Sequence, residues 1–133
     1  MDDPVWIRED VLLAIHNRQL AEHGGEPGVR DMGLLQSALG RPKNLWAYSD
    51  PKPDWAVLAA SYAFGIARNH AFIDGNKRTA LVVCRTFLRL NGFEVVAPDG
   101  DKYSTFLGLA AGELPESELA QWLRGHLQQR SHA

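Results

Sequence analysis

The chain has 133 residues, enough for one compact domain with a core and too few for two domains of ordinary size. Its formal net charge of −2 and pI near 6.2 give no bulk attraction to nucleic acid or to an anionic membrane, so we expect no direct nucleic-acid binding and no membrane association. The single cysteine, Cys84, excludes an internal disulfide and a cysteine-based metal site, and the N-terminus shows no apolar signal region, which favours a cytoplasmic location.

The first predicted helix spans residues 7–23. Its apolar side chains recur with helical spacing, and the glycine pair at 24–25 supplies the signal that ends it. His16 and His23 fall near the polar side of this helix. We therefore expect each of the two imidazoles to be solvated, or to cap the helix, rather than to take part in a site.

A turn and a second helix follow. Pro27 presets the backbone for the first central position of a type II turn, and Gly28 accepts the positive φ angle of the next position. Asp31 can then cap a helix that runs through Leu39. From residue 40 to residue 53 the pattern is broken by three prolines although aromatic residues remain, which predicts a loop or flap packed against the domain. Such a segment either closes over a ligand or is an ordinary covered loop.

Two helices are predicted around the stretch 70–80, which has the densest chemistry in the chain. Asp54 is placed to cap the first helix, which continues to about Asn69 and contains many small residues, so close neighbours are expected on several sides. The second helix runs from about residue 76 to residue 90, and Asn91 with the following glycine ends it. The stretch 70–80 therefore sits on a helix–loop–helix.

The remainder of the chain is predicted to be mainly helical. Residues 93–96 alternate and are β-branched in part, which allows a short extended piece too small to found a sheet. A weaker helix is expected from about Lys102 to Ala111, and a final helix begins with Pro115 at its first position and continues to Gln129. The prediction is one all-α domain over residues 1–133, with about six helices.

The start of the helix after the loop is predicted to attract anions. The first backbone N–H groups of a helix have no internal partner, and the helix dipole is positive there. Gly75 lets the backbone approach a ligand closely, and Asn76 can hydrogen-bond a phosphate oxygen. Lys77 and Arg78 add positive charge at a point where cations are unfavourable by up to ~1 kcal/mol each unless an anion binds.

Asp74 and His70 each have two interpretations at this stage. Asp74 can cap the following helix and pair with Lys77 or Arg78, or it can hold a magnesium ion that bridges nucleotide phosphates. His70 can cap the preceding helix, or it can accept a proton from an attacking hydroxyl, since its unperturbed pKa is near ~6.5. The anion site beside it favours the second interpretation of His70.

Four neighbouring side chains are assigned by position alone. Phe72 is expected to be a buried anchor that fixes the loop. Arg68, one turn before His70, either reaches the site or is solvated, and we assign it to the phosphate site. Arg85 and Arg89 fall on one face of the following helix, which is either a solvated face or a basic strip for an acidic partner.

The sequence resembles the Fic/Doc (Fido) superfamily, and within it the Doc branch of toxins from toxin–antitoxin pairs. The core of the likeness is His70-Ala71-Phe72-Ile73-Asp74-Gly75-Asn76-Lys77-Arg78. Residues 24–35 are similar to the N-terminal signature of the family, 87–92 follow the core motif as in the Doc branch, and 112–114 with the closing helix also fit. The resemblance implies a compact helical Fido-type fold that transfers part of a nucleoside triphosphate to a protein hydroxyl.

The resemblance also implies roles for the residues of the motif. By it, His70 is the general base and Asp74 is the magnesium ligand. Asn76, Lys77 and Arg78 form the phosphate site at the turn made by Gly75. ATP and Mg²⁺ are the cofactors that these roles require.

Departures from the adenylylating branch of the family point to a particular reaction. Adenylylating members have a second glycine where this chain has Lys77, and a second arginine where it has Leu81. Doc-like proteins share the lysine and act as kinases, which implies transfer of the γ-phosphate of ATP to a translation factor, elongation factor Tu, with inhibition of translation and growth. Adenylylation of a protein hydroxyl and a non-catalytic binding module are the alternatives.

Restraint of this activity is expected to come from a second chain. Some members of the superfamily carry an inhibitory helix with the pattern Ser/Thr-x-x-x-Glu-Gly/Asn, and this sequence has no match to it. The resemblance then implies a separate antitoxin, with a disordered segment that folds into a groove on this domain.

Overall fold

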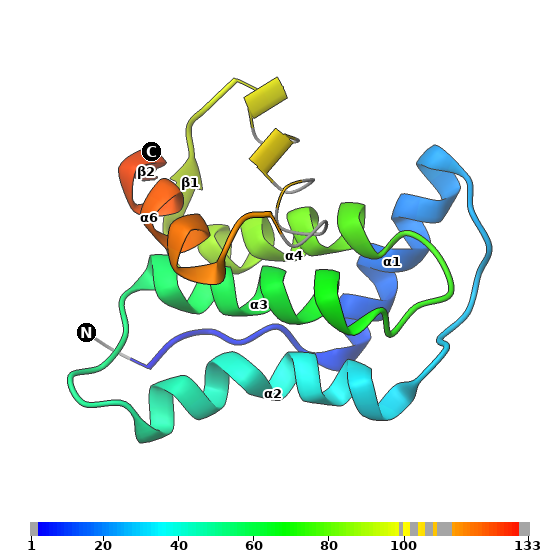
Figure 1. The fold of residues 1–133 in the computed structure, drawn as a ribbon, viewed down its shortest axis with the longest axis horizontal. Helices are drawn as coiled ribbons and strands as arrows, with labels where there is room; N and C mark the ends of the chain where they lie inside the picture. Colours follow the sequence, from blue (N-terminus) through cyan, green and yellow to red (C-terminus); the bar gives the residue numbers. More distant parts are fainter. Residues whose placement is uncertain (1–2, 99, 102–103, 106–107, 109–112, 131–133) are drawn as a thin grey trace.

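The structure, a computed structural model, describes residues 3–98, 100–101, 104–105, 108 and 113–130 (Figure 1). Helices dominate this part of the chain, which confirms the predicted all-α class. The named elements are α1 (Glu9–His23), α2 (Met32–Tyr48), α3 (Trp55–Asn69), α4 (Asn76–Leu90), β1 (Phe93–Val95), α6 (Glu116–His126) and β2 (Leu127–Gln129).

The helix α3 is the centre of the fold. It packs against α2, α4 and α6, and ten of its fifteen residues are buried. Figure 1 shows it between α2 and α4. Gly65 lets α2 come close, because a Cβ atom there would lie 3.2 Å from the backbone of Ala38. Close packing on several sides holds α3 in place, and with it the backbone at the start of the turn that follows.

The two helices that flank the loop have the predicted boundaries. The Asp54 side chain caps α3 by accepting a hydrogen bond of 2.9 Å from the N–H of Val57. The helix α4 ends at Leu90, and Gly92 after it has the positive φ angle of +93°. Cys84, inside α4, is fully buried, and burial raises the pKa of its thiol to about 12. The thiol is therefore a packed core group.

The prediction for residues 40–53 is wrong. The helix α2 does not stop near Leu39 but continues through Pro42 to Tyr48. A proline inside a helix removes one hydrogen bond and costs about 3 kcal/mol by itself. Here Pro42 is buried in line with Leu39, and Leu45 packs against the core, so apolar burial outweighs the local preference. The remaining connection to α3 is short.

The C-terminal part also differs from the prediction. Residues 127–129 leave the helix and form β2, which pairs antiparallel with β1, so the short extended piece does found a small two-stranded sheet. Pro115 is the N-cap of α6 rather than its first helical residue. Most of the helix predicted from Lys102 to Ala111 lies outside the described residues; within it, 104, 105 and 108 are helical.

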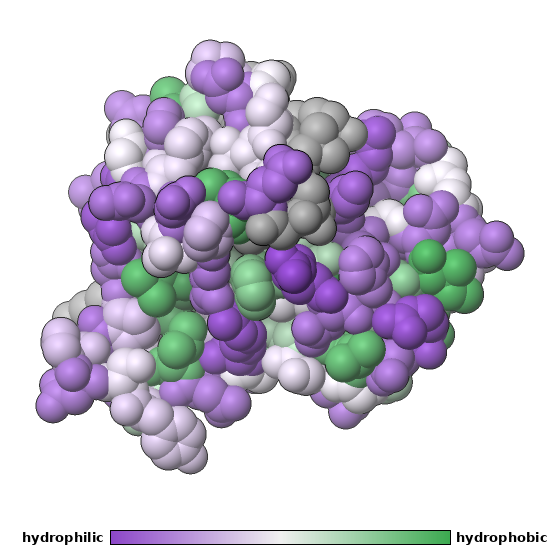
Figure 2. Space-filling view, viewed as in Figure 1, coloured by the Kyte–Doolittle hydropathy of each residue, from purple (hydrophilic) through white to green (hydrophobic). Residues whose placement is uncertain are grey.

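The outer surface is mainly polar on the face drawn in Figure 2. Hydrophilic residues cover most of that face, and hydrophobic ones are confined to small separate patches. None of the helices in the described part of the chain is both long and apolar enough to cross a membrane.

Candidate functional site

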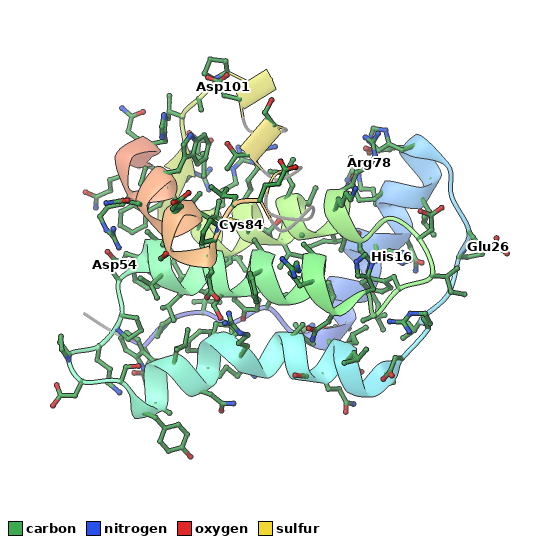
Figure 3. All side chains as sticks on the ribbon, in the orientation of Figure 1. His16, Glu26, Asp54, Arg78, Cys84 and Asp101 are labelled. Atoms are coloured by element: carbon green, nitrogen blue, oxygen red, sulfur yellow. The ribbon has the colours of Figure 1, made fainter. Side chains whose placement is uncertain are left out.

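The motif predicted to carry chemistry forms the turn between α3 and α4, and its side chains line one pocket of about 320 Å³. Figure 3 shows Arg78, His16 and Glu26 at the end of the molecule where this turn meets α1 and the loop that follows α1. The pocket is lined by His70, Ile73, Asp74, Gly75, Asn76, Lys77 and Arg78. Six of the predicted site residues are therefore brought together.

The start of α4 has the features of an anion site. Gly75 is the N-cap, in the left-handed region at φ +78°, and no side chain of the cap residue bonds the first turn. The first turn contains no acidic residue. Lys77 and Arg78 are exposed in it, and no carboxylate among the described residues pairs with the Lys77 side chain. The N–H groups of a first helical turn, the positive end of the helix dipole and a cationic side chain therefore lie together here.

The Asp74 carboxylate is exposed and is held by two backbone donors. Its Oδ1 accepts a hydrogen bond of 2.8 Å from the N–H of Gly75, and its Oδ2 accepts one of 3.2 Å from Glu26. A carboxylate has about four acceptor sites, so lone pairs remain for a ligand. No group of three His, Cys, Asp or Glu side chains suited to a metal occurs among the described residues. A magnesium ion, which takes one or two carboxylates together with phosphate oxygens, fits this donor set.

His70 ends α3 in an unusual backbone conformation. At φ +51° and ψ +47°, it is the one non-glycine residue of the described chain with a positive φ angle. Arg30 holds this turn, since its guanidinium donates to the carbonyl of His70 at 2.8 Å and to that of Asn69 at 3.2 Å. The exposed imidazole then lines the pocket. The bonds from Arg30 thus hold the backbone from which the His70 side chain extends.

Asn76 and Phe72 shape the loop from inside. The Asn76 side chain accepts from the N–H of Phe72 at 3.1 Å and donates to its carbonyl at 3.0 Å. We expected this side-chain amide to bond a phosphate oxygen. Asn76 is 92% buried, however, and its amide already bonds the backbone of Phe72, so the backbone N–H of Asn76 is the group left for an anion. Phe72 is 1% exposed and packs in the core.

The loop between α1 and α2, residues 24–31, supports the motif from outside. The N–H groups of Arg30 and Asp31 donate to the carbonyl of Ala71 at 2.7 and 3.1 Å, and Ile73 donates to Gly28 at 3.1 Å. At Gly25, where φ is +126°, a side chain would be strained, and its Cβ atom would lie 2.9 Å from the Asp74 carboxylate and displace it. This function of the Gly-rich turn was not foreseen from its turn chemistry.

The prediction of a solvated or capping imidazole is wrong for His16. It is 2% exposed, not on the polar side of α1, and its Nε2 lies 2.8 Å from the carbonyl oxygen of Asp74. A signal for this was present, because His16 follows the buried Leu12 by four residues and so falls on the same helix face. What the chain order could not reveal is that this face meets residue 74.

Arg68 is the predicted site residue that lies elsewhere. Its guanidinium stands over the ring of Phe64, 5.6 Å from the centroid, and it does not line the pocket. On α4, Arg89 pairs with Glu94 at 2.8 Å, and the hydrogen bond from this arginine holds the pKa of Glu94 below its usual range. Of the two interpretations of this helix face, a solvated face suits Arg89 better than a basic strip, because Glu94 already pairs with its guanidinium.

Comparison with known proteins agrees with this geometry. A sequence model described as the Fic/DOC family matches residues 6–88, which include the motif and its support from α1 and residues 24–31. The chain is 36% identical over 119 residues to "Protein kinase doc" of Escherichia phage P1, across 89% of this chain and 92% of that protein. It is 44% identical over 90 residues to "Toxin Doc" of Mycolicibacterium smegmatis, across 68% of this chain and 66% of that protein. The chain belongs to the Fic/Doc family, as a Doc-type member.

Proposed function

We propose that this protein is a toxin that transfers the γ-phosphate of ATP to a hydroxyl group of a protein. The observation that carries the proposal is that one pocket collects a histidine, a carboxylate and the cationic, side-chain-uncapped start of a helix. These are the groups that phosphoryl transfer needs, because its catalysis consists mostly of positioning and charge stabilisation.

The proposed division of labour follows the position of each group. The N–H groups at the start of α4, with Lys77 and Arg78, would bind phosphate oxygens. Asp74 would hold Mg²⁺, which when bound offsets phosphate charge and aligns the reacting groups. His70 would accept the proton of the attacking hydroxyl through its exposed imidazole. The hydrogen bonds from Arg30 to the carbonyls of Asn69 and His70 would help to keep that imidazole at the pocket.

Lys77 supports phosphoryl rather than adenylyl transfer. Its side chain lines the pocket at the position where adenylylating relatives are expected to have glycine, and this would disfavour an arrangement with the α- and β-phosphates against the backbone there. Leu81, where those relatives are expected to have arginine, packs against the core and offers no charge. The kinase name of the phage P1 relative supports the same choice.

The target and the restraint of the toxin belong to the same proposal. By resemblance, the acceptor is a hydroxyl of elongation factor Tu, and its modification would stop translation and growth. A partner antitoxin would restrain the toxin through a segment that folds on binding. The names of the two relatives, a kinase and a toxin, support this view of the chain.

Labelled ATP distinguishes the two reactions. The protein is incubated with Mg²⁺, elongation factor Tu and ATP labelled at either the α- or the γ-phosphate. We expect label on the target from γ-labelled ATP alone, and no label with His70→Ala. Label from the α position would establish the adenylyltransferase alternative. Nucleotide binding without transfer from either position, to this target or to a lysate, would favour a binding module.

A growth assay tests the toxin role. The wild-type protein and His70→Ala are each induced in a bacterial host at matched soluble levels. Growth arrest is expected from the wild type alone. Normal growth with abundant folded wild-type protein would contradict the proposal.

A further inference from the structure

His16, on α1, makes two contacts with the turn between α3 and α4. Its ring stacks on Phe72 with centroids 3.7 Å apart and planes 10° from parallel. Its Nε2 lies 2.8 Å from the carbonyl oxygen of Asp74. A carbonyl oxygen only accepts hydrogen bonds, so Nε2 is the donor. The two contacts fix both the plane of the imidazole and the direction of its N–H.

The bond to Asp74 acts on a rigid unit. The carbonyl of Asp74 and the N–H of Gly75 belong to one planar peptide group. His16 binds the oxygen end of this plane, and the Asp74 carboxylate accepts from its N–H end at 2.8 Å. A rotation of the plane would therefore move the N–H away from the carboxylate and tilt the N-cap of α4. His16 is placed to prevent that rotation.

We propose that His16 is a positioning residue, which through this peptide plane sets the direction of the Asp74 carboxylate and the start of α4. The inference rests on the proposed function, in which that carboxylate holds magnesium beside the phosphates. Groups that hydrogen-bond around a metal-binding carboxylate typically change metal affinity by about 10–100-fold when removed. The competing view is that His16 only fills space in the core.

Two substitutions separate the hydrogen bond from the packing. His16→Phe keeps a ring to stack on Phe72 and removes the donor. His16→Gln removes the ring and keeps a nitrogen donor at about the distance of Nε2 from the backbone. ATP affinity of both variants and of the wild type is measured by calorimetry with and without Mg²⁺, at a temperature where all three are folded.

The expected result is a selective loss in one variant. His16→Phe should lose about tenfold or more of its ATP affinity in the presence of Mg²⁺ and little in its absence, whereas His16→Gln should stay within about threefold of the wild type. Equal behaviour of the two variants, or losses that do not depend on Mg²⁺, would overturn the proposal, because a space-filling residue has no selective effect on the cation.

A second readout is independent of nucleotide. The hydrogen-exchange rate of the Gly75 amide, measured by NMR, reports the hydrogen bond at the far end of the peptide plane. It should rise in His16→Phe and stay near the wild-type value in His16→Gln. If the wild type shows no effect of Mg²⁺ on ATP binding, the proposed function fails and this exchange rate still decides the role of His16. An unchanged rate in both variants would contradict it.

Discussion

The first turns of α3 and α4 are built in opposite ways. Both helices have fifteen residues and pack against each other. The start of α3 has an aspartate cap, Asp54, which bonds the N–H of Val57 and pairs with Arg124 at 2.7 Å. The start of α4 has Gly75 in place of a capping side chain and carries Lys77 and Arg78. Figure 3 shows the two starts, marked by Asp54 and Arg78, at opposite ends of the molecule.

The difference fits the proposal that the start of α3 serves folding and the start of α4 serves a ligand. A side-chain cap contributes about 1 kcal/mol, and a cation in the first turn costs up to ~1 kcal/mol in the field of the helix dipole. The start of α4 therefore lacks a stabilising side-chain cap and carries cations that destabilise it. The stability that this chain gives up at α4 would be regained when a phosphate binds.

The largest expected effect is the loss of phosphoryl transfer when His70, beside the start of α4, is replaced. His70→Ala should reduce phosphoryl transfer by about 10²–10⁴-fold, the usual range for loss of a general base, with ATP affinity nearly unchanged. His23→Ala, at the exposed end of α1, is the matched control and should retain full activity. Single-turnover kinetics and calorimetry measure the two quantities. A parallel loss of affinity in the variant would indicate a binding rather than a proton-transfer role.

Reversing the charge at the α4 start should move stability and binding in opposite directions. Lys77→Glu is expected to raise the free energy of unfolding by several tenths of a kcal/mol without ligand, because it places an acid near the positive dipole end. It should weaken ATP binding by about tenfold or more through loss of a charged contact. Urea titration and calorimetry provide the test. Lys43→Glu, at an exposed position of α2, is the charge control. Weaker binding without a gain in stability would contradict the dipole argument.

Removing the cap of α3 should give a purely structural loss. Asp54→Ala is expected to lower the free energy of unfolding by about 1 kcal/mol, with ATP affinity unchanged. Partial burial acts to raise the pKa of Asp54, but the hydrogen bonds from Arg124 and Val57 outweigh it and hold the pKa below its usual value. The charged pair thus stabilises the fold near neutral pH, and its contribution disappears as the pH falls below about 4.

The pH dependence separates the cap from the ion pair. Asp54→Asn keeps a capping oxygen and loses the charge, so its deficit relative to the wild type should shrink as acid protonates the wild-type carboxyl. Denaturant melts at several pH values measure this. A deficit that stays constant down to acid pH would show that the charge of Asp54 contributes nothing.

The smallest effect is expected at Arg68. Since its guanidinium lies over Phe64 and outside the pocket, Arg68→Ala should leave ATP affinity within about twofold of the wild type. Arg78→Ala, on the pocket lining, is the comparison and should weaken binding clearly. Calorimetry on both variants checks this. A strong effect of Arg68→Ala would support the assignment of Arg68 to the phosphate site that the sequence predicted.

Local chemistry predicted the helices around the site better than it predicted the support of the site. The caps and limits of α3 and α4 followed from Asp54, the small-residue stripe and Gly92, because these signals act within a few residues. Pro42 predicted a break in α2 that does not occur, because burial of the neighbouring side chains outweighs the local cost of a proline inside a helix. The contact of His16 with Asp74 joins residues 58 apart in sequence, and no single-sequence pattern encodes such a pairing.

Amide chemical-shift mapping of bound ATP and Mg²⁺ tests the central claim most directly. If the start of α4 is the phosphate site, the largest shifts should fall on the backbone amides of residues 75–78, and the amides of 55–58 at the start of α3 should not move. Shifts spread equally over both helix starts, or concentrated away from residues 70–78, would contradict the account.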